Sequence, residues 1–267
     1  MSTRTVLGID AAWTEREPSG VALISDDGSG WRLVEVVASY DGFFLASDGE
    51  PIVRHRGSLL DAKKIVTAVE GKTGSMPDLV AIDMPLSRVP IVARRFSDNL
   101  ISSLYGARGG GTHTPGSTRP GRISDDLRAG FDEAGYRLAL TELRGRDLIE
   151  VYPHPALIEL AAADQRLPYK HSKIAKYWRQ DLPAVRRQRL LEVWSGIVTL
   201  LDGRIQGTKV ALPLPAVDAR GYEMKAFEDS LDAVICAWVG VCALDGRAKG
   251  YGDGESAIWV PTAIDRC

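Results

Sequence analysis

The stretch Thr5-Val6-Leu7-Gly8-Ile9-Asp10 decides the fold of this chain, together with its counterpart Leu79-Val80-Ala81-Ile82-Asp83. Each is an unbroken apolar run that ends in an aspartate, and such runs are typical of strands that are buried on both faces of a sheet. Strands of this kind occur in α/β proteins, where helices cover the sheet. We expect Asp10 and Asp83 to lie side by side at the ends of adjacent strands and to point into a cleft.

Turn residues and helical periodicity divide the rest of the chain. Further strands are expected at 20–24, 31–37 and 148–152, the first two joined by a hairpin at 26–30. Helices are expected to begin near Ser58, Arg94, Ser124, Pro155, Pro183 and Phe227. This order predicts an α/β fold with a mixed, five-stranded sheet flanked by helices. We expect a single domain over residues 1–267, with a helical insertion at about 86–145, after the fourth strand.

Composition narrows the class of protein. The formal net charge is −2, so any surface that binds nucleic acid must be local. The three cysteines have no metal-ligand spacing, and an odd number of them suits a reducing compartment. The chain starts without a secretory apolar segment, and its longest apolar run, 233–244, is too short to span a bilayer. We therefore expect a cytoplasmic protein that does not engage membranes.

Five short motifs together resemble a known family. They are Gly8-Ile9-Asp10, Ala81-Ile82-Asp83-Met84-Pro85, Glu150-Val151-Tyr152-Pro153-His154-Pro155, Leu167-Pro168-Tyr169-Lys170 and Asp229-Ser230-Leu231-Asp232-Ala233. As a set, spread over nearly the whole chain, they resemble the bacterial family called domain of unknown function 429, described as predicted RNase-H-like nucleases. The resemblance implies an RNase-H-like fold and a nuclease that hydrolyses phosphodiesters with two divalent metal ions.

The candidate metal ligands are aspartates at the ends of apolar elements. Buried carboxylates repel one another, and a divalent cation such as Mg²⁺ or Mn²⁺ between them relieves that repulsion. We expect Asp10, Asp83 and either Asp229 or Asp232 to be both metal ligands and catalytic residues, with Asp10 bridging the ions. Helix capping would also explain Asp229 and Asp232 at the start of the last helix, and a turn would explain Asp83.

Two residues near the fifth strand are further candidates. Strand alternation aims Glu150 either at solvent or at the acidic cleft, where it would be a metal ligand. His154, between two prolines, would assist proton transfer as a catalytic residue, or else pack as a structural hydrogen-bonding group.

Basic residues supply the candidate contacts to nucleic acid, either DNA or RNA. In the segment 166–189 we expect Lys170, Lys173 and Lys176 to contact phosphates beside interleaved aromatic rings, unless they form a solvated helical face. The glycine-rich stretch 106–111 lacks the lysine of a phosphate-binding P-loop and is expected to be a mobile loop over the cleft. Arg108, Arg119 and Arg122 would contact phosphates from this loop region. Arg94 would either bind substrate or brace the loop.

Three functions fit these features. The first is a Mg²⁺- or Mn²⁺-dependent phosphodiesterase that acts on nucleic acid. The second is a non-catalytic binding protein that keeps the fold. The third is a phosphotransferase of the actin and sugar-kinase type, which would need a turn rich in glycine and threonine after Asp10. The sequence there is Ala11-Ala12-Trp13, which argues against it.

Overall fold

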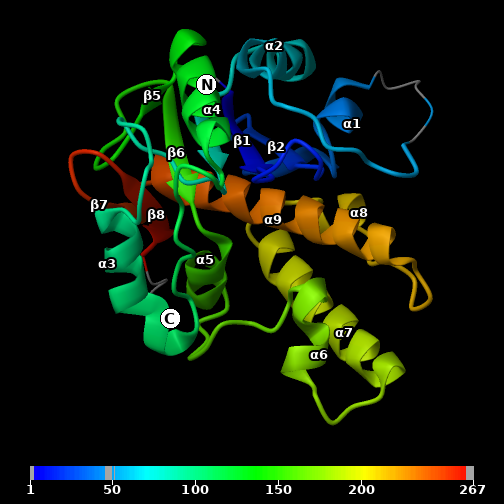
Figure 1. Ribbon diagram of the computed structural model, residues 1–267. Coiled ribbons are helices and arrows are strands. Elements are labelled where there is room, and N and C mark those ends of the chain that lie inside the picture. Colours follow the sequence, from blue (N-terminus) through cyan, green and yellow to red (C-terminus); the bar gives the residue numbers. More distant parts are fainter. Residues whose placement is uncertain (1–2, 46–49, 51, 263–267) are drawn as a thin grey trace.

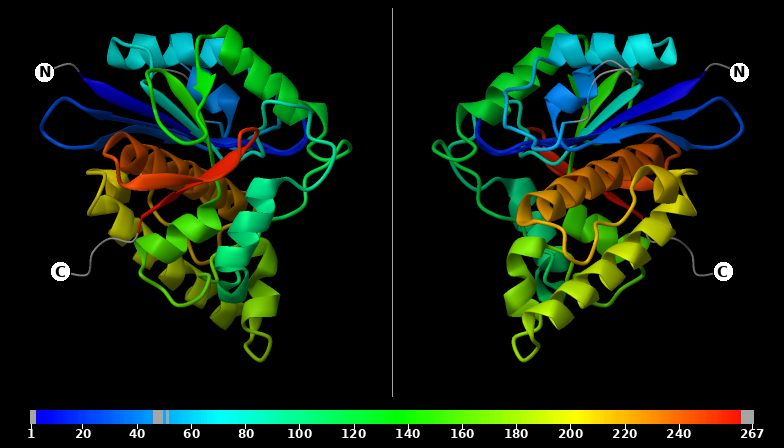
Figure 2. Two further views of the ribbon diagram at one scale, coloured as in Figure 1. Left: turned by 90° about the vertical axis from the view of Figure 1, so that its left-hand side faces the viewer. Right: turned by 90° about the vertical axis from the view of Figure 1, so that its right-hand side faces the viewer.

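A computed structural model describes residues 3–45, 50 and 52–262 of this chain. It contains a mixed sheet flanked by helices on both faces, as Figure 1 and Figure 2 show. The mixed α/β class is therefore confirmed, but the predicted number of five strands is wrong, because the sheet has eight. The additional strands are one of only two residues and a short hairpin at the end of the chain. The two-residue strand is too short to show a pattern, whereas the apolar run at 257–261 is present in the sequence and was overlooked.

The strands run in the order β3-β2-β1-β4-β6-β8-β7, with β5 paired to β6 beside this path. The first four are β1 (Arg4–Asp10), β2 (Gly20–Asp26), β3 (Arg32–Val37) and β4 (Leu79–Ile82). The others are β5 (Arg137–Leu138), β6 (Asp147–Val151), β7 (Ala248–Gly252) and β8 (Ala257–Pro261). Strands β1, β4, β6 and β8 are parallel to their neighbours in that series, whereas β2, β3 and β7 pair antiparallel. The carboxyl ends of β1, β4 and β6 therefore lie along one edge.

The helices fill the connections between these strands. Before β6 they are α1 (Tyr40–Phe44), α2 (Ala62–Thr73), α3 (Phe96–Tyr105), the 3₁₀ turn η1 (Gly106–Arg108) and α4 (Arg122–Glu133). After β6 they are α5 (Pro153–Leu160), the 3₁₀ turn η2 (His171–Lys173), α6 (Ile174–Tyr177), α7 (Pro183–Asp202), α8 (Thr208–Ala211) and α9 (Gly221–Leu244). The segment 86–145 thus contains α3, η1, α4 and β5, and a second helical segment lies between β6 and α9. Within the described ranges, no helix is both long and apolar enough to cross a membrane.

Helix α9 begins earlier than its sequence pattern indicates. It starts at Gly221, where the side chain of Glu223 accepts a hydrogen bond from the backbone of Arg220. Asp229 and Asp232 are therefore in the interior of the helix, not in its first turn. The capping explanation for these two aspartates is wrong, since both are buried beside the sheet.

The two faces of the sheet carry separate cores. Alternation along β1 turns Val6 toward α9 and Leu7 toward the opposite core, which α2 and α4 cover. In Figure 2 the sheet lies between α2 and α4 on one side and α9 on the other. Residues two apart share a face, so Asp10 at the end of β1 is on the same face as Val6, next to α9.

Glycines allow α9 to lie directly against the sheet. A Cβ atom at Gly8 would be 2.3 Å from the carbonyl oxygen of Ala233, and one at Gly20 would be 2.0 Å from that of Asp229. Neither approach is possible for a residue with a side chain. The close packing brings the middle of α9, with its two aspartates, to the carboxyl end of β1.

Candidate functional site

Asp10 and Asp83 are neighbours at the edge of the sheet. Strands β1 and β4 are in parallel register, with Gly8 beside Ala81, and the amide of Asp83 donates to the carbonyl oxygen of Ile9 at 2.8 Å. The two aspartates therefore follow matching positions and share the face that α9 covers. Both line a cleft of about 480 Å³. Among the described residues, no hydrogen bond or ion pair reaches either carboxylate.

Asp229 and Asp232 lie beneath this cleft and are held by lysines. They are 1% and 0% exposed. Lys225, one turn earlier on α9, forms an ion pair with Asp229, and Lys170 forms one with Asp232. The hydroxyl of Tyr169 also donates to Asp232 Oδ1 at 2.8 Å. The second oxygen of Asp229, Oδ2, is buried and has no partner in the described part of the chain.

The pKa values in this cluster are raised. Burial, followed by repulsion from Asp232 and Asp229, raises the pKa of Asp10 well above its usual value. Burial and the charge of Asp232 raise the pKa of Asp83 to about 8. Burial also raises the pKa of Asp229 to about 6, against the attraction of Lys225. The acidic cluster therefore favours any added positive charge, whether a proton or a cation.

The donor set fits a divalent cation in its chemistry. Asp10, Asp83 and Asp229 Oδ2 offer carboxylate oxygens with no other partner, and hard cations prefer such ligands. Among the described residues, however, no group of three or more His, Cys, Asp or Glu side chains has an arrangement that could hold a metal ion. The positive charge in this cluster comes instead from Lys170 and Lys225.

Glu150 lines the same cleft as Asp10 and Asp83, but it is paired with groups outside the acidic cluster. It lies beside Ile82 in the register of β6 and β4, which places it on the sheet face opposite Asp83. Arg95 donates to both of its oxygens, at 2.6 and 2.7 Å, and the amide of Leu86 donates to one of them at 2.7 Å. Burial raises the pKa of Glu150 to about 7, although Arg95 opposes this shift. The expectation that Glu150 faces solvent is wrong, because it is 3% exposed. Its paired oxygens do not support a role as a metal ligand.

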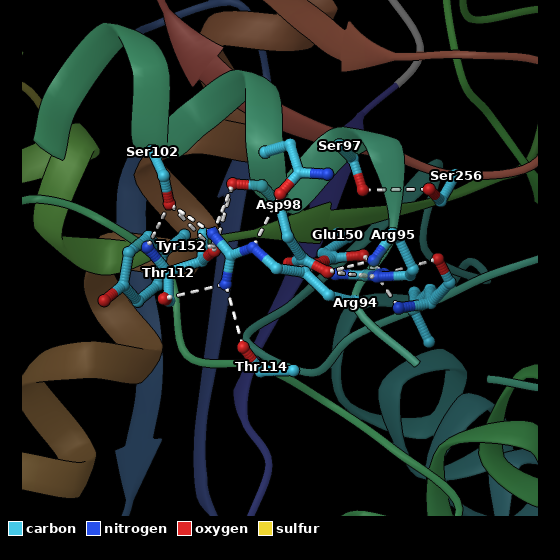
Figure 3. A network of polar contacts seen from close by, with 12 residues as sticks. Arg94, Arg95, Ser97, Asp98, Ser102, Thr112, Thr114, Glu150, Tyr152 and Ser256 are labelled. Carbon is cyan, nitrogen blue, oxygen red and sulfur yellow. Dashed lines mark hydrogen bonds and ion pairs between the residues drawn. The ribbon is translucent and has the colours of Figure 1, made fainter. Parts of the chain in front are cut away.

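Arg94 braces the loop above the cleft, which is the second of its two predicted roles. It donates to Ser102 Oγ at 2.6 Å, Thr112 Oγ1 at 3.1 Å and Thr114 Oγ1 at 3.0 Å. Figure 3 shows this fan of contacts beside the network in which Arg95 joins Asp98 and Glu150. Two successive arginines thus fasten α3 to the loop on one side and to the sheet on the other.

The other predicted phosphate contacts divide between the cleft and the outer surface. Lys170 and Lys173 line the cleft. Arg108 instead pairs with Glu159 at 3.1 Å, and Arg122 is exposed and lies 3.7 Å from Asp126. Lys176 is exposed and lies outside the cleft lining. The solvated-face interpretation therefore applies to Lys176 and Arg122, but not to Lys170.

His154 lies in the first turn of α5 and lines the cleft. It is 5% exposed and packs edge-on against Tyr152 and Tyr169, with ring centroids 5.2 and 5.4 Å away. Burial lowers its pKa well below the usual value, so the ring is neutral at pH 7. Its Nδ1 atom is buried without a partner among the described residues.

Several cleft residues were not predicted from the sequence. Lys225, Glu228, Arg166 and His113 all line the cleft. The sequence does carry a signal for Lys225, which is four residues before Asp229 and therefore on the same helical face. Arg166 and His113 are in irregular segments, where no periodicity shows which way a side chain points.

Comparison with known proteins gives one match. The model of a protein family described as "Protein of unknown function (DUF429)" matches residues 8–256, a range that includes every side chain of the cleft named above. No curated protein and no solved structure matches this chain.

Proposed function

This chain belongs to the DUF429 family of proteins of unknown function, and we propose from its cleft that it is a metal-dependent phosphodiester hydrolase acting on nucleic acid. One observation carries the proposal. Asp10 and Asp83, on adjacent parallel strands, face the same cleft with no hydrogen-bond donor on either carboxylate among the described residues. Both side chains are half-buried, and a pair of unpaired carboxylates at such a site is unfavourable unless a ligand uses it.

The order of the central strands supports an RNase-H-like arrangement for this function. Three antiparallel strands, β3-β2-β1, are followed by β4 and β6 in parallel, and a long helix crosses the sheet beside the carboxyl ends of β1 and β4. The resemblance of the sequence motifs implies this same order. The strands outside it, β5, β7 and β8, lie beyond the acidic cluster and extend the sheet.

Asp10 and Asp83 would hold the cation, and water and substrate oxygens would complete its coordination. A bound Mg²⁺ or Mn²⁺ would stabilise the attacking and leaving oxygens of the phosphodiester. In the reaction an oxygen of water bonds to phosphorus, the bond to the leaving oxygen breaks, and the proton lost by water is balanced by one gained at the leaving group. His154 lines the cleft as a neutral ring, but burial and nearby cations hold its pKa well below the usual value, so it would hydrogen-bond to substrate or water and would not be a strong general base.

The two lysines favour a second candidate, a binding protein without metal chemistry. Lys170 and Lys225 already neutralise Asp232 and Asp229, so positive charge is built into the site. A cleft of this kind can bind an anionic ligand with no cation present. The candidates differ in whether a divalent cation binds at Asp10 and Asp83.

Titration with Mn²⁺ and Mg²⁺, followed by calorimetry and melting curves, tests the proposal. At a free ion concentration of about 100 times the dissociation constant, binding to the folded protein adds about 2.7 kcal/mol to the free energy of unfolding. Asp83→Asn should abolish this response, and the exposed Asp132→Asn should retain it. Hydrolysis of labelled single-stranded DNA and RNA should require the same ion. The absence of both stabilisation and hydrolysis at millimolar ion would leave the binding protein as the function.

A further inference from the structure

One wall of the cleft is basic and lacks counter-ions. We call His113, Arg119, Arg166 and Lys173 the basic wall; all four line the cleft. They come from two segments that are distant in the sequence, one between η1 and α4 and the other between α5 and α6. Within the described ranges, none of these four side chains forms an ion pair with a carboxylate. Lys170 and Lys225 differ in this respect, since both are paired to aspartates.

Arg166 is the residue of the basic wall with unpaired hydrogen-bond donors. Its Nε and Nη2 atoms are buried and have no hydrogen-bond partner in the described part of the chain. The side chain is anchored at its base, because the Arg166 amide donates to the carbonyl oxygen of Arg108 at 2.7 Å. Arg166 is half-buried as a residue, and buried donors of a charged group are unfavourable unless an anion accepts from them.

His154 lies close to several of the positive charges in the cleft. It is 5% exposed, lines the same cleft and has a buried, unpaired Nδ1. After burial, the charges of Arg166, Lys170 and Lys173 lower its pKa further. The pKa of His113 is lowered by burial and then by Lys173, Arg166 and Arg119. Both imidazoles are therefore affected by Arg166 and Lys173, and all four side chains line the same cleft.

We propose that the basic wall binds a phosphate group of the substrate, beside the acidic cluster. The wall offers the guanidinium groups of Arg166 and Arg119 and the ammonium group of Lys173. A phosphate ester has enough oxygens to accept from all three groups, whereas a carboxylate has only two oxygens. This inference deepens the proposed function and rests on it for the source of the phosphate, a nucleotide unit of nucleic acid. Arg119 also lies over the ring of Trp13, 5.7 Å from its centroid, which fixes its position at the cleft.

Inorganic phosphate tests the subsite directly, with the full chain in buffer free of divalent cations at pH 7. Calorimetry should show phosphate binding to the wild type and binding of acetate at least about tenfold weaker. Arg166→Gln and Lys173→Gln should each weaken phosphate binding by about tenfold, and Arg166→Lys should recover part of the loss. Lys176→Gln is the matched control, since it removes the same charge outside the cleft, and it should change the affinity by less than about twofold. Melting curves of each variant establish that it is folded, and Lys173→Gln serves as the test if Arg166→Gln does not fold.

A second arm identifies the source of the phosphate. A short oligonucleotide that binds at least about tenfold tighter than a nucleoside monophosphate, and that loses affinity in Lys173→Gln, would place a nucleic-acid phosphate on the wall. Equal affinities, still reduced in the variant, would indicate a small phosphate ester. The subsite is overturned if the folded wild type binds no phosphate, or if Lys176→Gln weakens binding as much as Lys173→Gln.

Different results would reject the phosphate subsite and the proposed hydrolase function. Asp83→Asn removes the response to Mn²⁺ but should leave phosphate affinity unchanged or tighter, because it removes a negative charge from the cleft. Phosphate binding without any Mn²⁺ response would reject the hydrolase and keep the subsite. A Mn²⁺ response without phosphate binding would reject the phosphate subsite and keep the hydrolase.

Discussion

Gly8 on β1 lies directly against Ala233 on α9, so closely that a Cβ atom at Gly8 would be 2.3 Å from the Ala233 carbonyl oxygen. On α9, Asp232 directly precedes Ala233, and Asp229 is one turn before it. Two residues after Gly8, β1 ends in Asp10. The spacing between strand and helix at this point therefore determines whether the three aspartates form one cluster.

Gly8→Ala should separate α9 from the sheet and destabilise the protein by about 1–3 kcal/mol or more, since the methyl group meets rigid backbone. The divalent cation response should weaken in the same variant. Gly196→Ala is the matched control: that glycine is exposed in α7, with nothing within 4 Å of an added Cβ, and the change should stabilise by about 0.5–1 kcal/mol. Urea denaturation with and without Mn²⁺ measures both effects. Equal stability of Gly8→Ala and wild type would disprove the close approach.

Asp10→Asn and Asp83→Asn should change stability and metal response in opposite directions. Neither carboxylate has a hydrogen-bond donor among the described residues, so loss of its charge relieves repulsion without breaking a bond. The metal-free variants should be as stable as wild type or more stable by about 0.5–2 kcal/mol. Both should lose the Mn²⁺-induced rise in melting temperature. Destabilised variants that still respond to Mn²⁺ like wild type would mean that these aspartates are structural.

Without divalent cations, the free energy of unfolding should fall as pH rises between about 4 and 8. Burial raises the folded-state pKa of Asp83 to about 8, from an ordinary value of 3.8. The folded protein therefore binds this proton more tightly than the unfolded chain, and the resulting stability is complete at low pH and is lost as pH approaches 8. Burial shifts Asp229, with a pKa of about 6, in the same direction.

Denaturation midpoints at pH 5 and pH 8 measure this dependence. Asp83→Asn should reduce the difference between the two midpoints, and millimolar Mg²⁺ should reduce it in the wild type. A midpoint difference that neither change affects would assign the pH dependence to other groups.

Glu150→Gln should destabilise the protein by about 3–5 kcal/mol, because it breaks a buried pair and leaves part of the Arg95 charge without its partner. The response to Mn²⁺, measured at a temperature where the variant is folded, should persist. Glu133→Gln provides a matched control: its pair with Lys63 is exposed, and its loss should cost less than about 1 kcal/mol. Loss of Mn²⁺ binding in Glu150→Gln, with stability intact, would instead make Glu150 a metal ligand.

Lys225→Gln should tighten binding of Mn²⁺ by between about twofold and tenfold. The ammonium group of Lys225 occupies one oxygen of Asp229 and competes electrostatically with a cation. Its side chain is 48% exposed, so the substitution leaves no buried gap. Calorimetry with Mn²⁺ gives the comparison. Weaker Mn²⁺ binding in Lys225→Gln would show that the lysine supports the cation site and does not oppose it.

Much of the architecture could be predicted because it is local. The apolar runs that became β1 and β4 are unbroken, and a buried strand is the structure that such runs favour. The hairpin between β2 and β3 follows from a run of aspartates and glycines. Strand β5 has only two residues and β7 contains two glycines, so neither shows strand periodicity. Strand β8 is a buried apolar run longer than β4, and its signal in the sequence was overlooked. The start of α9 was missed because its first turns, from Gly221 to Ala226, are mostly exposed and polar.

The sequence by itself determined which residues end the central strands, and therefore that Asp10 and Asp83 are at one edge of the sheet. Only the tertiary structure decided which other side chains join them. In the register of β4 and β6, Glu150 pairs with Ile82, the residue before Asp83. Because neighbouring positions of a strand point to opposite faces, Glu150 points away from Asp83 and pairs with Arg95. Asp229 and Asp232 join the cluster because glycines let α9 touch β1 and β2. Lys170 and Lys225 balance the charges of Asp232 and Asp229 in the folded protein, and that balance depends on distances in space that chain order does not record.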